Sequence, residues 1–198
     1  MGNKVITIGR EYGCGGRLVA KKLAEKLGFA YYDSDLISLA AEKTGMTESY
    51  VKEIEQKKVS NFLYSLFLPG QTLTLPDQVF IAQAEVIRAA AAKESCVFVG
   101  RCADYILKDF DNCVNLFLHA PLETRITRVC EEYKEIGRDQ AEAYIARKDK
   151  ERASYYNYFS TNIWGNYKNY DLCIDCRIGI DATVGLIGKF LELRFPEQ

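Results

Sequence analysis

The segment Val5–Arg17 has the residue types of an anion-binding turn. The four consecutive β-branched residues from Val5 to Ile8 predict a buried strand. Gly13-Cys14-Gly15-Gly16-Arg17 follows, and an apolar pattern at helical spacing begins at Leu18. In such a turn the backbone N–H groups point inward, with the positive end of the helix dipole behind them. A tight turn that binds nothing is the alternative that the glycines alone leave open.

Arg17 is the residue that favours an anion at this turn. In the first turn of a helix a cation opposes the helix dipole at a cost of about 0.3–1 kcal/mol, which a bound anion would offset. The standard phosphate-binding loop reads G-x-x-x-x-G-K-[ST], and no lysine follows the glycines here. The sequence therefore predicts a phosphate site whose positive charge comes from arginine.

Polar residues also follow two other predicted strands. Asp33 and Ser34 come after a short strand that ends at Tyr32, and Arg101 comes after the apolar strand Cys96–Val99. In parallel sheets ligands bind at the carboxyl ends of strands, so these residues are expected near the glycine turn. Capping of the next helix by the first two, and pairing of the arginine with a carboxylate three residues on, are the alternatives.

Two pairs of charged residues lie on predicted helices. Arg125 and Arg128 are three residues apart, as are Asp149 and Arg152, so each pair shares one helical face. A solvated charged face is the alternative for each pair alone. An aromatic group that follows is expected to be core rather than a base-stacking surface. Its members are Tyr155, Tyr156, Tyr158, Phe159 and Trp164.

The elements that position these residues alternate between strand and helix. This order predicts an α/β fold with a mostly parallel five-stranded sheet and helices on both faces, in one domain that spans residues 1–198. The predicted strands are 5–8, 28–33, 96–99, 113–118 and 170–174. The predicted helices include 18–27, 36–43, 47–57, 78–93, 121–136, 139–156 and 181–193.

The composition excludes several classes of protein. Hydrophobic residues make up 48% of the chain, charged residues 27%, and the net charge is −1, so nothing indicates nucleic acid or a membrane as a partner. Seven cysteines at irregular spacing indicate reduced thiols and a cytoplasmic protein. Cys173 and Cys176 have no second pair of ligands nearby, and the single histidine, His119, is expected to be structural rather than a metal ligand.

Taken in order, the motifs resemble those of nucleoside monophosphate kinases of the bacterial cytidylate kinase type. The resemblance is closer to the divergent cytidylate-kinase-like family, with its Gly-Arg-x-Tyr-Gly-x-Gly-Gly start and Gly-Arg-Cys-Ala-Asp centre, and it spans nearly the whole chain. The motifs that carry it are the glycine turn, Tyr32-Asp33-Ser34, Val99-Gly100-Arg101, Arg125-x-x-Arg128, Asp149-x-x-Arg152 and Tyr170–Asp175.

This resemblance implies a P-loop kinase fold with a helical lid at about residues 125–152 and an acceptor-side flap within 34–77. The implied donor-phosphate residues are Arg10, Gly13, Cys14, Gly15, Gly16, Arg17 and Leu18. The implied acceptor residues are Asp33, Ser34, Arg101, Asp149 and Arg152. Arg17, Arg101, Arg125 and Arg128 are the implied catalytic cations.

The chain departs from the cytidylate kinase pattern at the loop and beside it. Arg10 stands in place of the first loop glycine, Gly16 in place of the lysine, and Arg17 in place of the magnesium-side hydroxyl or its neighbour. Val99 and Cys102 each stand where those kinases have an aspartate. Phe80 falls where a further acceptor-side arginine is expected.

The resemblance predicts transfer of the γ-phosphoryl group of ATP, with Mg²⁺, to CMP, dCMP or a related small acceptor. Asp33 or Asp104 is the candidate magnesium ligand. The departures leave two alternatives: a nucleotide-binding sensor or interaction protein without transfer activity, and a kinase for a different small acceptor. Residues 60–77 are predicted to form an acceptor-side flap or the contact of a homodimer.

Overall fold

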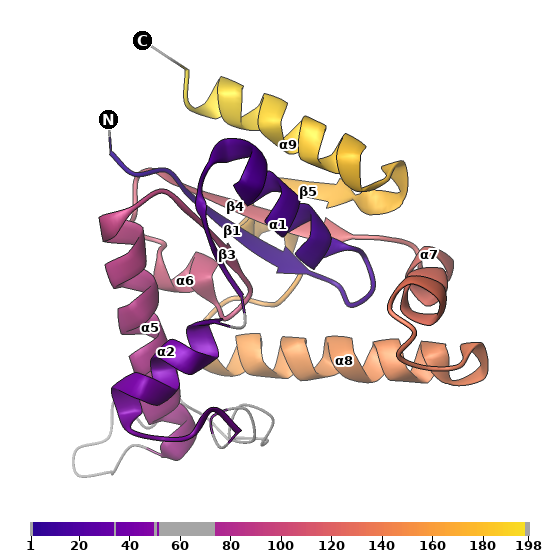
Figure 1. Ribbon diagram of the computed structural model, residues 1–198, viewed down its shortest axis with the longest axis horizontal. Coiled ribbons are helices and arrows are strands. Elements are labelled where there is room, and N and C mark those ends of the chain that lie inside the picture. Colours follow the sequence, from indigo (N-terminus) through magenta and orange to yellow (C-terminus); the bar gives the residue numbers. More distant parts are fainter. Residues whose placement is uncertain (1, 34, 50, 52–73, 197–198) are drawn as a thin grey trace.

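A computed structural model describes residues 2–33, 35–49, 51 and 74–196. Five parallel strands form one sheet in the order β2-β3-β1-β4-β5, which confirms the predicted fold class (Figure 1). The strands are β1 (Val5–Arg10), β2 (Ala30–Tyr32), β3 (Cys96–Val99), β4 (Cys113–His119) and β5 (Leu172–Asp175). Ser34 and most of the predicted flap, residues 52–73, lie outside the described residues.

Strand β1 is the central strand of the sheet, since it lies third in the strand order, between β3 and β4. Val5, Ile6 and Ile8 are fully buried, and β1 is hydrogen-bonded to β3 on one side and β4 on the other. Its register aligns Ile8 with Val99, the last residue of β3, so β1 runs on through Gly9 and Arg10 after β3 has ended. After their carboxyl ends the chain continues to opposite faces of the sheet, to α1 (Gly16–Leu27) after β1 and to α6 (Ala103–Ile106) after β3.

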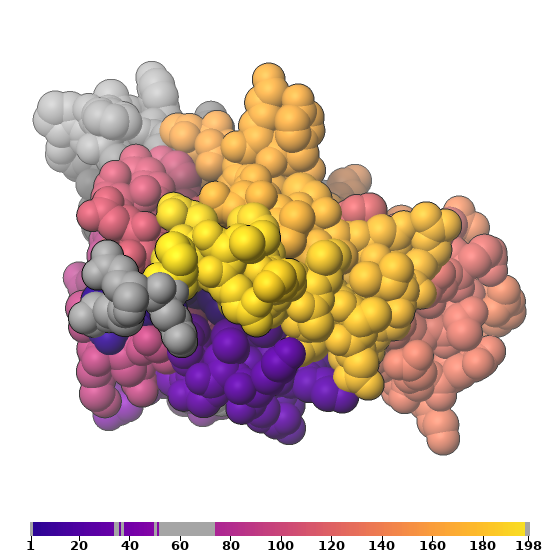
Figure 2. Space-filling view, turned by 90° about the horizontal axis from the view of Figure 1, so that it is seen from above, coloured from indigo at the N-terminus to yellow at the C-terminus, as the bar shows by residue number. Residues whose placement is uncertain are grey.

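Helices cover both faces of the sheet (Figure 1). On one face lie α1 (Gly16–Leu27) and α9 (Ile180–Arg194), which pack side by side over the core that includes Ile6, Leu23 and Ile187 (Figure 2). On the other face lie α2 (Asp35–Thr44), α5 (Leu75–Lys93), α6 (Ala103–Ile106) and α8 (Arg138–Phe159). Phe98 of β3 packs there with Phe159 of α8, which confirms that part of the aromatic group belongs to the core.

The helix predicted from Pro121 to about Ile136 ends earlier than expected. Helix α7 covers Leu122–Thr127, and one π-helical turn, Arg128–Glu132, follows it. The helix cannot continue because Lys134 adopts a left-handed conformation with φ of 55°. Single π-turns of this kind are frequent at functional sites.

Helix α5 begins three residues before the predicted start at Gln78. Thr74 and Asp77 form a reciprocal capping box, in which the Thr74 N–H donates to Asp77 Oδ2 at 3.0 Å. Pro76 lies in the first turn, where its missing N–H has no helical partner to lose. None of the described helices has the length and apolar composition that crossing a membrane requires.

Candidate functional site

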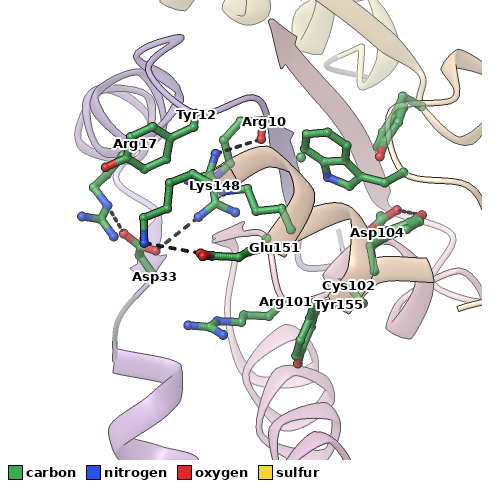
Figure 3. Close-up of a pocket in the computed structure, with 16 residues that line it drawn as sticks. Arg10, Tyr12, Arg17, Asp33, Arg101, Cys102, Asp104, Lys148, Glu151 and Tyr155 are labelled. Atoms are coloured by element: carbon green, nitrogen blue, oxygen red, sulfur yellow. Dashed lines mark hydrogen bonds and ion pairs between the residues drawn. The ribbon is translucent and has the colours of Figure 1, made fainter. Parts of the chain in front are cut away.

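A pocket of about 440 Å³ lies at the carboxyl ends of β1, β2 and β3 (Figure 3). Arg17 at the end of the glycine turn, Asp33 and Arg101 all line this pocket, as the positions of the predicted strands led us to expect. It is lined by Gly9, Arg10, Tyr12, Arg17, Asp33, Gly100, Arg101, Cys102, Asp104, Lys148, Glu151, Arg152, Tyr155, Tyr156, Trp164 and Tyr170. Five cationic side chains in this lining face three carboxylates, which gives the pocket an excess of positive charge.

The glycine turn owes its shape to Gly13 and Gly15, whose φ angles are 79° and 88°. Gly15 is the N-cap of α1, and a Cβ atom there would lie 2.7 Å from Ile180 Cδ1. The first turn of α1 holds no acidic residue and Gly15 provides no side-chain cap. The N–H groups at this helix terminus are therefore suited to an anion from outside the loop.

Arg10 and Arg17 are the predicted loop residues that line the pocket, and the others, Gly13, Cys14, Gly15, Gly16 and Leu18, do not. Cys14 is fully buried beneath the turn, and Leu18 is exposed on α1. The thiol of Cys176 hydrogen bonds to Cys14, which lowers the pKa of Cys14 and raises that of Cys176. Cys14 therefore anchors the turn to the segment after β5 rather than presenting its side chain to a ligand.

Asp33 is the carboxylate that counters two arginines of the pocket (Figure 3). Arg17 Nε lies 2.5 Å from Asp33 Oδ2, and the Arg17 side chain is 67% exposed at the rim. Arg10 Nη2 lies 3.9 Å from Asp33 Oδ1, and the Arg10 side chain is only 17% exposed. The two cations next to the glycine turn thus differ in depth, with Arg10 inside and Arg17 outside.

Arg152 of α8, one of the predicted acceptor residues, lies beside Arg10 in the pocket. Its Nη1 donates to the backbone oxygen of Arg10 at 3.1 Å, and its guanidinium stacks on the ring of Tyr12 with a centroid distance of 4.9 Å. Burial lowers the pKa of Arg152, and burial with the charge of Arg152 lowers the pKa of Arg10 to about 9 while Asp33 opposes the shift. Both guanidiniums remain cationic at neutral pH and would gain from an anionic ligand.

Arg101 and Asp104 take different positions in the turn after β3. Arg101 and Cys102 both have positive φ, 56° and 54°, a costly backbone conformation that is common at ligand-binding sites. Arg101 lies over the ring of Tyr155 at 6.0 Å. Asp104 accepts a hydrogen bond from Tyr156 Oη at 2.6 Å, and burial raises the pKa of its carboxyl despite that bond.

The structure places Arg125 and Asp149 against each other rather than in the pocket lining. Arg125 Nη1 lies 2.6 Å from Asp149 Oδ2, and Arg125 Nε lies 3.6 Å from Glu11 Oε2. The other oxygen of Asp149 accepts from the N–H of Tyr12 at 2.6 Å. This pair links α7, α8 and the glycine turn, and a nucleoside contact by Asp149 stays a prediction.

Arg128 is buried and holds the glycine turn from below. Its Nη1 donates to the carbonyl oxygen of Gly13 at 3.0 Å, and its Nε lies 3.3 Å from Glu132. A solvated charged face does not describe this residue. The predicted contact of Arg125 and Arg128 with donor phosphates stays a prediction, and both arginines support the turn in the structure.

Sequence reasoning missed two charged residues of the pocket. Lys148 and Glu151 of α8 line the pocket with Arg152, and Lys148 Nζ lies 3.4 Å from Glu151 Oε2. Lys148 precedes Glu151 by three residues and Arg152 by four, so it shares a helical face with each, a pattern that the sequence contains. The aromatic side chains of Tyr155, Tyr156 and Trp164 also line the pocket, so the aromatic group is partly core and partly pocket wall.

The carboxylates of the pocket fit a magnesium ion that is coordinated mainly by the phosphates of a ligand. They fit less well an ion that is coordinated mainly by protein side chains. Among the residues that the structure describes, no three His, Cys, Asp or Glu side chains cluster as a metal site. Asp104 accepts a hydrogen bond from Tyr156 and burial raises its pKa, whereas Asp33 lies in the lining against the guanidinium groups of Arg17 and Arg10. Mg²⁺ in such sites keeps several waters and uses one or two carboxylates with substrate phosphates, a role that Asp33 fits.

Comparisons with known proteins agree with this fold. A model of the cytidylate kinase-like family matches residues 5–177. The cytidylate kinase of Methanosarcina barkeri is 26% identical over 196 residues, which cover 91% of this chain and 98% of that protein. An uncharacterised protein from Eubacterium ventriosum has a structure with a TM-score of 0.74 at 30% identity, covering 96% of this chain and 99% of that one.

More distant structures share the fold. A shikimate kinase from Bacteroides thetaiotaomicron has a TM-score of 0.57 at 14% identity, with 96% of this chain and 98% of that chain covered. It shows that this arrangement of sheet and helices is a P-loop kinase fold. Because the family model extends over most of the sequence, from β1 to the segment after β5, the chain belongs to the cytidylate kinase-like family.

Proposed function

We propose that the protein transfers the γ-phosphoryl group of ATP to CMP, dCMP or a related small acceptor. The observation that carries the proposal is the convergence of Arg17, Asp33 and Arg101 on one pocket with an excess of cations. Phosphoryl transfer is mostly positioning and neutralisation of phosphate charge, so a cationic pocket at a helix N-terminus supplies the main requirements.

The residues divide between the two substrates. The amides of the turn, with Arg10 and Arg17, bind the donor phosphates, and Arg101 with Arg152 binds the phosphate of the acceptor. Ser34 and Asp149 are proposed to orient the nucleoside. No strong base is required because an acceptor phosphate is already an anion. Asp33 would be the protein ligand of a Mg²⁺ ion that arrives with the donor, and the ion would supply neutralisation of phosphate charge.

The acceptor is proposed from the relative named a cytidylate kinase, which matches this chain over nearly its whole length. Distant neighbours that include a gluconokinase from Sinorhizobium meliloti favour a second candidate, a kinase for another small acceptor, because they show other kinases on this fold. A third candidate, a nucleotide-binding sensor without transfer activity, is favoured by the ion pair that holds Arg17 to Asp33.

We also propose roles for three segments of the chain and a cellular compartment for the enzyme. Residues 125–152 form the donor-side lid, residues 34–77 form the acceptor-side region, and 60–77 form a flap or a homodimer contact. The free thiols fit a cytoplasmic enzyme, since a reducing compartment preserves them.

A coupled assay against a panel of nucleotides and small acceptors tests the proposal, together with ATP binding by calorimetry. Turnover with CMP or dCMP at the highest kcat/KM supports the acceptor named here. Turnover with another acceptor favours the second candidate, and ATP binding without turnover favours the third. A protein that neither binds ATP nor turns it over contradicts all three.

A further inference from the structure

The stem of Arg10 lies where a side chain of residue 16 would begin. A Cβ atom built on Gly16 would be 2.9 Å from Arg10 Cβ and 3.0 Å from Arg10 Cγ. Carbon atoms in packed contact prefer separations of about 3.5–4.0 Å, so the stem of Arg10 would have to move before residue 16 could carry a side chain. Positions 10 and 16 are therefore sterically coupled.

The guanidinium of Arg10 reaches the opposite wall of the pocket. A Cβ atom on Gly100 would be 1.9 Å from Arg10 Nη1 and 3.1 Å from Arg10 Cζ, and Gly100 has a φ of 74°. The side chain thus spans the floor between the start of α1 and the turn after β3 (Figure 3). Glycine at both ends gives Arg10 the room to do so.

The charge of Arg10 is less well countered than that of Arg17. Asp33 is 3.9 Å from Arg10 but 2.5 Å from Arg17, and Arg152, Arg101 and Arg17 all act on Arg10 as like charges. A cation that is held largely away from water among other cations is costly unless an anion joins it. This environment points to a ligand with several negative charges.

In a standard phosphate-binding loop the seventh position carries the lysine that reaches the donor β- and γ-phosphates, and the first position is glycine. Here the first position is Arg10 and the seventh is Gly16. We propose that Arg10 supplies the charge of the absent lysine to the polyphosphate of the donor, while Arg17, at the rim and paired with Asp33, makes the smaller contribution. This inference rests on the proposed function and names the cation on which that function depends.

The test compares charge removal at three arginines. Arg10→Gln keeps most of the stem and removes the charge, Arg17→Gln does the same at the rim, and Arg88→Gln is a matched control on the exposed face of α5. Calorimetry measures binding of Mg·ATP and of inorganic tripolyphosphate. We expect Arg10→Gln to weaken both about ten- to a hundredfold, Arg17→Gln by less than about fivefold, and Arg88→Gln to match wild type.

A second comparison tests the coupling of positions 10 and 16. Gly16→Lys alone is expected to lose thermal stability and to gain no affinity, because its Cβ meets the Arg10 stem. The double variant Arg10→Gly with Gly16→Lys rebuilds the usual loop and is expected to recover ATP affinity at least tenfold over Arg10→Gly alone. A melting curve for each variant separates loss of binding from loss of fold.

The outcomes distinguish this inference from the proposed function. If Arg10→Gln binds ATP and tripolyphosphate within twofold of wild type, or if Gly16→Lys alone binds as tightly as the double variant, the inference is overturned and the proposed kinase stands. If Arg17→Gln shows the larger loss, the charge is assigned to Arg17 instead. A wild-type protein that binds neither probe overturns both proposals.

Discussion

Arg125 and Asp149 form an ion pair of 2.6 Å that joins the end of α7 to the middle of α8. Asp149 uses its second oxygen to accept from the Tyr12 N–H at 2.6 Å, so one carboxylate fixes two helices and the glycine turn. The side chains of the pair are 12% and 18% exposed. A pair this sheltered loses much more when one partner is removed than a surface pair does.

Replacing Asp149 with Ala is therefore expected to lower the free energy of unfolding by about 3 kcal/mol. The loss arises because Arg125 keeps a sheltered charge and the Tyr12 N–H loses its acceptor. Urea unfolding measures it, and Glu142→Ala, at an exposed position of the same helix, is expected to change stability by less than about 0.5 kcal/mol. Wild-type stability combined with a raised KM for the acceptor alone would assign Asp149 to the nucleoside instead.

Asp33→Asn is expected to strengthen binding of inorganic tripolyphosphate in the absence of Mg²⁺ by up to about tenfold, or ~1.4 kcal/mol. The substitution removes the counter-charge of Arg17 and Arg10 while nearly preserving shape. Calorimetry gives the affinity, and Asp139→Asn, at an exposed position of α8, is the control. Weaker binding by Asp33→Asn would show that Asp33 orders the arginines rather than competing with the anion.

Asp104→Asn is expected to change the pH dependence of stability. Burial raises the pKa of Asp104 above the unfolded value of 3.8, so the folded protein binds more protons than the unfolded chain between those two pKa values. The contribution of the Asp104 carboxyl group to the free energy of unfolding is therefore fully present below about pH 3.8, and it is lost as the pH rises through the pKa of the folded state. The variant keeps an acceptor for Tyr156 without this loss.

Urea unfolding at several pH values between 4 and 8 measures this effect. The stability of Asp104→Asn relative to wild type is expected to increase with pH across that range. Asp109→Asn, at an exposed position beyond α6, is expected to follow the wild-type curve. Parallel curves for wild type and Asp104→Asn would contradict the assignment of a raised pKa to Asp104.

Gly100→Ala is expected to lower the free energy of unfolding by about 2–3 kcal/mol. A φ of 74° disfavours any residue with a Cβ atom, and that atom would meet Arg10 Nη1. Thermal unfolding measures the loss, and Gly185→Ala in α9, where a Cβ atom would meet nothing, is expected to be neutral or stabilising. If Gly100→Ala costs less stability in an Arg10→Ala background than in the wild type, the difference measures the collision with Arg10. The loss that remains measures the cost of the positive φ for alanine.

The sequence was sufficient for the strands because buried parallel strands consist of short β-branched runs such as Val5–Ile8, and these need no tertiary information. It also placed Asp33 and Arg101 near the glycine turn, since residues after parallel strands share one edge of the sheet. Element boundaries were less accurate where a single backbone conformation decides them, as at Lys134.

Side-chain partners were the part that the sequence did not provide. The spacing of Arg125 and Arg128 predicts a shared helical face, but their partners Asp149 and Gly13 come from other segments that only the fold brings near. The difference between Arg10 and Arg17 likewise depends on side-chain direction. Arg10 ends β1 and Arg17 lies in the first turn of α1, yet the Arg10 side chain is 17% exposed and that of Arg17 is 67% exposed.

The contact between Arg10 and Gly16 also constrains how such a loop could diverge from one that contains lysine. If arginine replaced glycine at position 10 while lysine was still present at position 16, the two side chains would collide near their Cβ atoms. Both cations would also be directed at the same phosphate. If the lysine were lost first, an intermediate without the central charge would have to persist. The two replacements are expected to occur together in related chains, with glycine retained at position 100, so this trio can be sought in any alignment of the family.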